Sequence, residues 1–286
     1  MGECRETGDL TEDLATNAAS PESIRHSIRN GEWRRGTGEI GAGFVQANLV
    51  ALPAEMALAF LTFCWRNSRA CPLLDVTDVG SSRPLLAAPS ADLRTDLPRY
   101  RVYEKGRIVA EPESVVQQWS ESHVGFLLGC SFTFEAALLE AGIRLRHIEE
   151  GKVVSMFLTN WPCRPSPPFG GQLVVSMRPI PRDKVRLAHE ISARFPFAHG
   201  APVHVGNPEQ LGIKDLSRPD YGDPVSVRPN EEPVFWACGV TGQLAAAQVK
   251  SGVVIGHYPG HMFITDWPSR ALTSHRLPAD WERLGG

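Results

Sequence analysis

The chain carries the same string of residue types twice. Residues 126–142 read FLLGCSFTFEAALLEAG, and residues 235–252 read FWACGVTGQLAAAQVKSG. Each copy predicts an apolar strand, a turn with the spacing Cys-x-x-Thr, and an Ala- and Leu-rich helix that ends at a glycine. We interpret the two stretches as an internal duplication, because so many matching residue types in one order do not arise readily by chance.

The similarity continues beyond the helices. Each copy runs on to a histidine, His147 or His257, and then to a second shared string. That string is MFLTN at residues 156–160 and MFITD at residues 262–266. Alternating strands and helices of this length favour an α/β fold.

Local patterns predict the other elements. Ser20 followed by Pro21 is typical of a helix start, here for a helix that reaches about Asn30. We expect further helices over residues 54–67, 113–121 and 183–195, strands over 73–79, 124–129 and 173–177, and a hairpin of 100–104 with 107–110.

Proline density divides the chain. From Cys163 to Glu232 prolines are frequent, and the pattern allows one strand and one helix followed by a long loop-like stretch. We therefore expect a main α/β domain over residues 20–160 and 233–286, a smaller α+β insertion over 161–232, and a disordered acidic lead-in over 1–19.

Charge and hydropathy exclude several classes of protein. Lys and Arg total 29 against 32 Asp and Glu, which argues against nucleic-acid binding. The apolar runs are too short for a membrane helix of ~20 residues, and the acidic N-terminus resembles no export signal. We therefore expect a cytoplasmic protein that binds neither nucleic acid nor membranes. Its 26 glycines and 23 prolines favour a site built from loops.

The six cysteines form no Cys-x-x-Cys pair, which excludes a zinc ribbon and a thioredoxin-like motif. Without an export signal we expect free thiols rather than disulfides. The sequence offers no standard metal-ligand spacing either, so we predict neither a metal nor a cofactor.

The repeated turns are the strongest candidates for chemistry. Each sets a thiol (Cys130, Cys238) and a hydroxyl (Thr133, Thr241) between a strand and a helix. The N-terminus of a helix favours a bound carboxylate, and the same field should lower the pKa of the thiol. If an approximate two-fold relates the copies, both turns could face one cleft. The plain alternative is that Cys and Thr are small residues suited to a tight buried turn.

Other polar residues could complete such a site. Gln46 and Asn48 follow the glycine-rich stretch 36–43, and Arg178 ends an apolar strand. Their amides and guanidinium could hold a polar substrate and its carboxylate. Arg146 and His147 follow the first repeat, and His199 precedes Gly200; a histidine suits acid–base work near neutral pH. Ordinary surface or core roles remain the alternative for each.

Together these strings resemble the D-glutamate cyclase-like family of hydro-lyases. The resemblance is carried by GFVQANL (43–49), CPLL (71–74), GCSFTFE (129–135), VVSMRP (174–179), His199-Gly200, Pro219-Asp220 with Gly222-Asp223, VFWACGVT (234–241), and Pro259-Gly260 with Thr265-Asp266. It implies a three-layer α/β domain joined to a smaller α+β domain. It also implies ring closure of D-glutamate to 5-oxo-D-proline with loss of water.

The chain departs from the family pattern in three loops. The usual Thr-small-Gly-x-Ala-Pro-Gly reads TGEIGAG at residues 37–43, so that Glu39 replaces a glycine. Pro-Ala-Gly becomes Pro165-Ser166-Pro167, and Thr-Pro-Gln becomes Thr241-Gly242-Gln243. We therefore expect the scaffold to carry over, while the substrate could differ, as in a biosynthetic paralogue.

We hypothesise a division of labour for loss of water from an amino-acid-like carboxylate. His147 or His199 supplies acid–base catalysis, and Cys130 and Cys238 do the same or line an oxyanion pocket. Substrate is bound by the remaining candidates: Gln46, Asn48, Ser131, Thr133, Glu135, Arg146, Arg178, Thr241, Gln243 and Asp266.

Two alternatives stay open. Two opposed thiols could act at Cα as a racemase or elimination enzyme, or the pocket could bind a small molecule without chemistry. A homo-oligomer is compatible with any of these functions.

Overall fold

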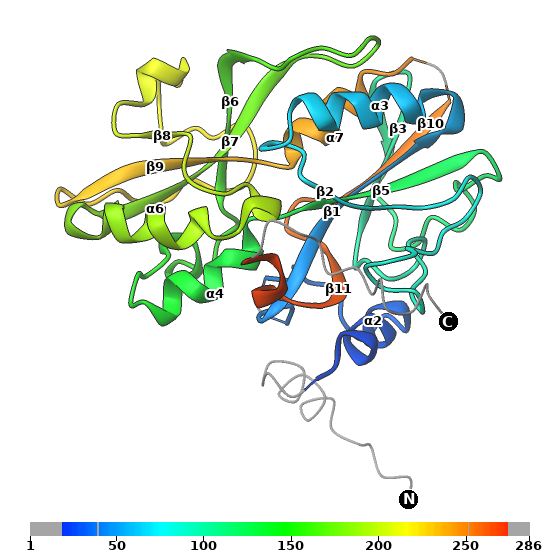
Figure 1. Ribbon diagram of the computed structural model, residues 1–286, viewed down its shortest axis with the longest axis horizontal. Coiled ribbons are helices and arrows are strands. Elements are labelled where there is room, and N and C mark those ends of the chain that lie inside the picture. Colours follow the sequence, from blue (N-terminus) through cyan, green and yellow to red (C-terminus); the bar gives the residue numbers. More distant parts are fainter. Residues whose placement is uncertain (1–18, 39, 251, 274–286) are drawn as a thin grey trace, which may run out of the picture.

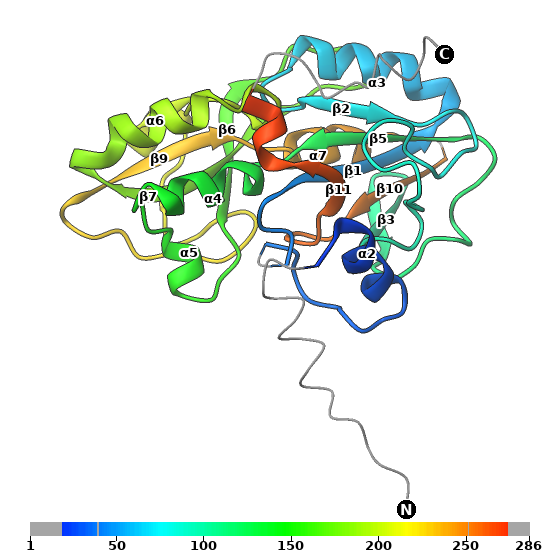
Figure 2. The same cartoon turned by 60° about the horizontal axis from the view of Figure 1, so that its bottom comes forward.

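The computed structural model describes residues 19–38, 40–250 and 252–273, which form a mixed α/β fold on two antiparallel sheets (Figures 1 and 2). The expected lead-in, apart from its last residue, and Glu39 lie outside the described residues. The α-helices are α2 (Pro21–Arg29), α3 (Ala54–Arg66), α4 (Phe132–Glu140), α5 (Arg146–Glu149), α6 (Val185–Ala193) and α7 (Val240–Ala247). Among these residues, no helix combines the length and the apolar character needed to cross a membrane.

The larger sheet has the strand order β2-β5-β1-β10-β3-β4, and β11 also pairs with β1. Its members are β1 (Phe44–Pro53), β2 (Leu73–Val76), β3 (Tyr100–Glu104), β4 (Arg107–Ala110), β5 (His123–Gly129), β10 (Val253–His257) and β11 (Phe263–Pro268). Strand β1 is central: β5 pairs along one edge, while β11 and β10 share the other.

The smaller sheet has the order β6-β7-β9-β8. Its strands are β6 (Ser155–Pro162), β7 (Gln172–Pro181), β8 (His204–Val205) and β9 (Glu231–Ala237). The insertion expected over residues 161–232 contains β7 and β8 whole, whereas β6 and β9 extend beyond it. All the strand pairs described in both sheets are antiparallel. The ligand crevice that is typical of doubly wound parallel sheets therefore does not occur in these two sheets.

Both copies of the shared string form a strand, a turn and a helix. Cys130 follows β5 and precedes α4, and Cys238 follows β9 and precedes α7. The first copy starts in the larger sheet and its next strand, β6, lies in the smaller one. The second copy starts in the smaller sheet and continues into β10 and β11 of the larger one. Each copy therefore links the two sheets.

The threonines of the two copies make matching hydrogen bonds. The Thr133 hydroxyl accepts from the backbone N–H of Gln46 in β1 at 3.2 Å, and the Thr241 hydroxyl accepts from that of Val174 in β7 at 3.0 Å. Further on, Thr159 donates to the Leu173 carbonyl at 2.8 Å, and Thr265 donates to the Val45 carbonyl at 3.0 Å. Strands β1 and β7 therefore occupy equivalent positions. Strand β1 binds Thr133 of the first copy and pairs with β11 of the second, whereas β7 binds Thr241 of the second copy and pairs with β6 of the first.

Several local predictions are confirmed. The Ser20 hydroxyl accepts from the backbone N–H of Ser23 and caps α2, and α3 begins directly after Pro53. Strands β3 and β4 form the expected hairpin, in which Lys105 (φ 50°) and Gly106 (φ 82°) take the left-handed conformations of a tight turn.

Two local expectations are corrected. Residues 113–121 make a single turn instead of a helix; it carries Val115 and Trp119 into the core. Strand β1 was not expected, because its side chains are buried on both faces and give no alternation of apolar with polar residues.

Strand β1 separates two apolar cores. Val45, Ala47, Leu49 and Ala51 belong to the core shared with α4, α6 and β9, whereas Val50 and Leu52 belong to the core under α3 and α7. Because successive side chains of a strand point to opposite faces, Gln46 and Asn48 lie on the side of Val50 and Leu52. The two polar residues of β1 are therefore directed to the same side as α7.

Candidate functional site

A buried ion pair lies beside the first repeated turn. Glu135, in the first turn of α4, accepts from Nε of Arg178 at 2.9 Å, and Nη2 of Arg178 contacts the same oxygen. Arg178 is wholly inaccessible to solvent and Glu135 is 6% exposed. Removing one charge would leave the other unpaired in the protein interior.

His147, in α5, completes the cluster. Its Nε2 lies 3.3 Å from Oε1 of Glu135, and the ring is buried. Burial raises the pKa of the Glu135 carboxyl, but Arg178 and His147 outweigh it and bring that pKa down to about 2. Glu135 is therefore ionised at neutral pH, and its oxygen orients the imidazole of His147.

Both terminal nitrogens of Arg178 also have partners. Nη2 donates to Ser131 at 2.9 Å, Nη1 donates to Ser176 at 3.1 Å, and the guanidinium lies 5.5 Å from the rings of Phe134 and Trp236. The structure thus gives Arg178 an internal role, as the cation that holds Glu135 and Ser131 in place.

The two repeated thiols sit next to this cluster. Cys130 is buried and Cys238 is half-buried, with its Sγ 3.7 Å from Sδ of Met156. The pKa of Cys130 is raised to about 12, chiefly by burial and to a smaller extent by the nearby Cys238 and Glu135, against a hydrogen bond from Phe132 and the charge of Arg178. Burial raises the pKa of Cys238 to about 11. The expectation of a lowered pKa was wrong, because desolvation exceeds the effect of the helix N-terminus.

The second copy replaces the charged cluster with a neutral one. Gln243 stands where Glu135 stands in the first copy, and its Nε2 donates to the His257 carbonyl at 2.8 Å. Nε2 of His257 lies 3.0 Å from Oδ1 of Asn48, while Nδ2 of Asn48 donates to the Gly129 carbonyl at 2.8 Å. Burial lowers the pKa of His257 to about 4. In the sequence His257 only aligns the two copies, and no pattern there marks its contact with Asn48.

Gln46 binds the glycine-rich loop. Its Oε1 accepts from the Thr37 hydroxyl at 2.8 Å, and its Nε2 donates to the Thr37 carbonyl at 3.1 Å. Thr37 in turn accepts from the backbone N–H of Met262. Thr133 and Thr241 are similarly engaged with backbone groups. These side chains fix the loop and the two helices relative to β1 and β7.

His199 lies in a different place. Its Nδ1 donates to the Arg69 carbonyl at 2.8 Å, and burial lowers its pKa to about 4. It lines a mainly apolar cavity of about 790 Å³ between α3 and the end of α6, together with Leu61 and Phe197. A packing role is enough to explain His199, because its imidazole is neutral and hydrogen-bonded to the backbone.

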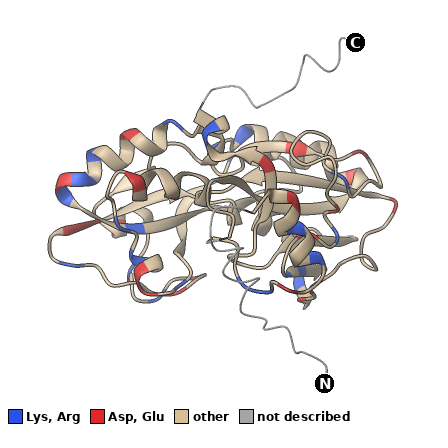
Figure 3. Cartoon of the chain, turned by 90° about the horizontal axis from the view of Figure 1, so that it is seen from below, with Lys and Arg blue, Asp and Glu red and all other residues tan. Residues whose placement is uncertain are grey.

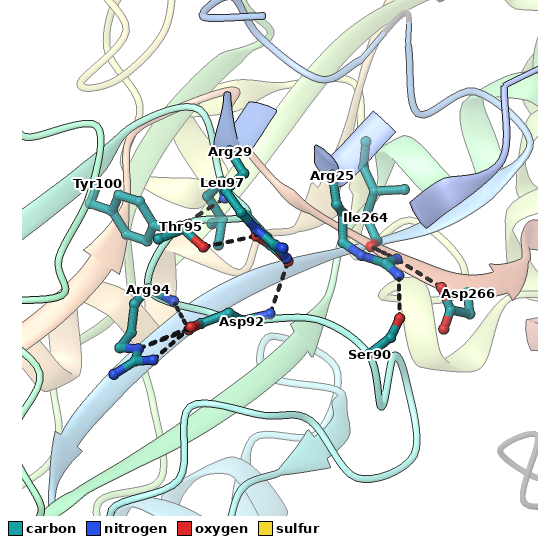
Figure 4. Close-up of polar contacts among 11 residues, drawn as sticks. Arg25, Arg29, Ser90, Asp92, Arg94, Thr95, Leu97, Tyr100, Ile264 and Asp266 are labelled. Carbon is teal, nitrogen blue, oxygen red and sulfur yellow. Dashed lines mark hydrogen bonds and ion pairs between the residues drawn. The ribbon is translucent and has the colours of Figure 1, made fainter. Parts of the chain in front are cut away.

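Arg146 and Asp266 are not brought to the cluster. Arg146 pairs with Glu231 and with Glu149, the latter at 3.3 Å. Asp266 pairs with Arg25 of α2 at 2.8 Å, and Arg25 also donates to the Ile264 carbonyl (Figure 4). The Asp266 pair ties α2 to β11.

A cleft of about 690 Å³ runs along α7. Of the residues expected from the sequence, Thr241 and Gln243 line it. Arg101 and Tyr103 of β3, and Tyr221, also line it. Arg101 and Tyr103 lie in the expected hairpin, and Tyr221 lies between Pro219-Asp220 and Gly222-Asp223 of the family resemblance, but none of the three was predicted to line a site.

The thiols, the possible metal ligands and the charges of the described residues also bear on the chemistry of the site. Over the described ranges, Cys64, Cys71, Cys130, Cys163 and Cys238 are free thiols, and no group of three or more His, Cys, Asp or Glu is placed to hold a metal ion. Lysines and arginines are interspersed with aspartates and glutamates along the chain (Figure 3).

Comparison with known proteins gives close relatives. A protein from Rubrobacter xylanophilus named "Putative hydro-lyase" is 59% identical over 87% of this chain and 96% of its own length. YcsI of Bacillus subtilis, with the same class name, is 51% identical over 88% of this chain and 98% of its own length. A nitrogen repressor-like protein of Methanococcus jannaschii, whose structure is solved, covers 82% of this chain at 9% identity with a TM-score of 0.37, too low to carry an argument.

The family model for D-glutamate cyclase matches residues 124–266. This span contains both repeated turns, the Glu135–Arg178–His147 cluster and the part of the cleft along α7. With the relatives matched over nearly their full length, the chain belongs to the D-glutamate cyclase family.

Proposed function

We propose that this protein is a hydro-lyase that removes water from a small amino-acid-like carboxylate, with ring closure of a glutamate-like substrate as the reaction. The observation that carries the proposal is the contact of His147 with the ionised, Arg178-bound Glu135. A histidine oriented by a buried, ionised carboxylate is suited to giving a proton to a leaving hydroxyl. Family membership supports the same class of reaction.

Ring closure requires protons to move from the substrate nitrogen to the oxygen that leaves as water. At neutral pH the substrate carries an ammonium group and a side-chain carboxylate. His147 takes one proton from the ammonium group, the nitrogen bonds to the carboxyl carbon, and a second proton passes from the nitrogen to a carboxyl oxygen, which becomes a hydroxyl. The C–O bond to this hydroxyl then breaks, and it leaves as water with the proton that His147 returns. Between these steps the oxygen carries negative charge, which needs hydrogen-bond donors. Cys130 and Cys238 are protonated at neutral pH and can serve as such donors.

The same thiols weigh against the racemase alternative. Removal of the Cα proton by one thiol and its return by the other requires that one of them be ionised. Burial raises the pKa of both Cys130 and Cys238 instead. The binding-only alternative was motivated by Glu39, which lies outside the described residues.

The test is incubation of the purified chain with D-glutamate and related D- and L-amino acids in D2O, followed by mass spectrometry and NMR. Ring closure gives a product lighter by one water that keeps its Cα proton. Deuterium at Cα without loss of water would instead support racemisation. Absence of any product across the panel would contradict the proposal.

Variants connect the reaction to the cluster. We expect His147→Asn to lower kcat by about 10²-fold or more, since an acid–base group is lost. His189→Asn, on the exposed face of α6, is the matched control and should retain full activity. An equal effect of the two substitutions would contradict the assignment of His147.

A further inference from the structure

The cleft along α7 has a one-sided charge. Among the residues that line it, the charged ones are Arg101 and Arg107, and none is an aspartate or glutamate. Thr241 and Gln243 also line it, so the cleft reaches the second repeated turn at the start of α7. A cleft with cations and without carboxylates on its wall attracts an anionic ligand.

Arg101 is held in a fixed position. Its Nε donates to Oε1 of Glu111 at 2.7 Å, and its guanidinium stacks 4.8 Å from the centre of the Tyr258 ring. Its side chain is 18% exposed. An arginine fixed in this way loses little side-chain entropy when it binds a ligand.

Tyr103 and Tyr221 line the cleft together with Arg101. Burial raises the pKa of Tyr103 and of Tyr221, and the nearby Arg101 charge opposes the shift in each case. Both hydroxyls are therefore protonated at neutral pH and can donate hydrogen bonds. Since Glu111 takes Nε, the terminal amino groups of Arg101 are left for Tyr103 and an incoming anion.

We propose that Arg101 is the residue that binds the substrate carboxylate, with the Tyr103 and Tyr221 hydroxyls beside it in the cleft along α7. This inference deepens the proposed function and rests on it for the identity of the substrate. It replaces Arg178, which the structure shows to be occupied by Glu135, Ser131 and Ser176. A guanidinium that faces a cleft can bind a carboxylate through two parallel hydrogen bonds.

Arg99 provides a matched control. It stacks on the same Tyr258 ring, 4.6 Å from its centre, and contacts the same Glu111, but it does not line the cleft. Arg99→Gln therefore removes the same kind of structural contact as Arg101→Gln without removing a cation from the cleft wall.

The experiment measures binding by calorimetry and ligand-observed NMR with two probes, 5-oxo-D-proline and 2-pyrrolidinone. They share the lactam ring, and only the first has a carboxylate. We expect Arg101→Gln to weaken binding of 5-oxo-D-proline by about 10- to 100-fold, the value of a hydrogen bond to a charged group. Arg101→Lys should lose less, and Arg99→Gln should bind within about twofold of the unmodified chain.

Three outcomes would overturn the inference. These are unchanged binding in Arg101→Gln, an equal loss in Arg99→Gln, and failure of the unmodified chain to bind 5-oxo-D-proline, D-glutamate or glutarate. Weak binding of 2-pyrrolidinone that is the same in all variants supports it. Carboxylate binding through Arg101 without any loss of water contradicts only the proposed function, whereas turnover that is unaffected by Arg101→Gln contradicts only this inference.

Discussion

Nε of Arg178 donates to Oε1 of Glu135 at 2.9 Å, and both side chains are almost completely excluded from solvent. Arg178 comes from β7 of the smaller sheet, while Glu135 comes from α4, which follows β5 of the larger sheet. The pair therefore joins the two sheets at the point where the first repeated turn begins its helix, and it couples the stability of this junction to the chemistry of His147.

The first prediction concerns loss of the Glu135 charge. We expect Glu135→Gln to lower the free energy of unfolding by about 3–5 kcal/mol, because Arg178 is then left buried without a counter-charge. The loss of His147 orientation should also reduce turnover. Urea unfolding followed by circular dichroism measures the first effect, and the product assay measures the second.

A double substitution controls this prediction. Glu135→Gln combined with Arg178→Met removes both charges, so we expect it to recover part of the lost stability while activity stays low. If the double variant is less stable than Glu135→Gln alone, the two side chains stabilise the fold independently and the ion-pair interpretation fails.

The second prediction concerns pH. The pKa values of His199 and His257 fall from 6.5 to about 4, so the folded chain favours neutral imidazoles. Their contribution to stability is complete above pH 6.5 and is lost as the pH falls toward 4. Glu135 adds a loss below its ordinary pKa of 4.5, toward about 2. We expect the free energy of unfolding to fall steadily from pH 7 to pH 4.

Unfolding curves at several pH values between 7.5 and 4 measure this slope. His199→Asn should flatten it between pH 6.5 and 4, whereas His189→Asn, at an exposed position, should leave it unchanged. A slope that is the same in both variants would show that the buried imidazoles do not control acid stability.

The sequence predicts those parts of the fold that carry local signals. The cap of α2, helix α3, the β3–β4 hairpin and the two strand–turn–helix units all have residue patterns of their own. Strand β1 could not be recognised, because a strand buried on both faces has no period of two and its Gln46 and Asn48 interrupt the apolar run.

The candidate site was predicted less completely, for a physical reason. A sequence shows that Arg178 and Glu135 are polar residues in apolar surroundings, but only the fold shows that they neutralise each other. For Arg101 the sequence carries no signal at all. It lies in a strand of ordinary composition, and it becomes a candidate only because the fold places it in one cleft wall with Tyr221 and α7, both of which are far from Arg101 in the sequence.

The third prediction concerns the reactivity of the repeated thiols. Because burial raises the pKa of Cys238 to about 11, few thiolates exist at pH 7.5, and we expect iodoacetamide to modify this half-buried residue slowly. The rate should keep rising up to pH 10. Peptide mapping by mass spectrometry follows the adduct, and the chain unfolded in urea provides the unperturbed rate. A rate in the folded chain that levels off below pH 8 would contradict the raised pKa.

The last prediction tests whether the two copies are equivalent in energy as well as in contacts. Thr133→Val leaves the backbone N–H of Gln46 without its acceptor, and Thr241→Val does the same to Val174. Each substitution should cost about 1–3 kcal/mol of unfolding free energy, the penalty of a buried donor left unpaired. Thr→Ser at either position keeps the hydroxyl and should cost less. Urea unfolding of the four variants provides the comparison, and a Val variant as stable as its Ser counterpart would show that the shared hydroxyl does not hold that helix to its strand.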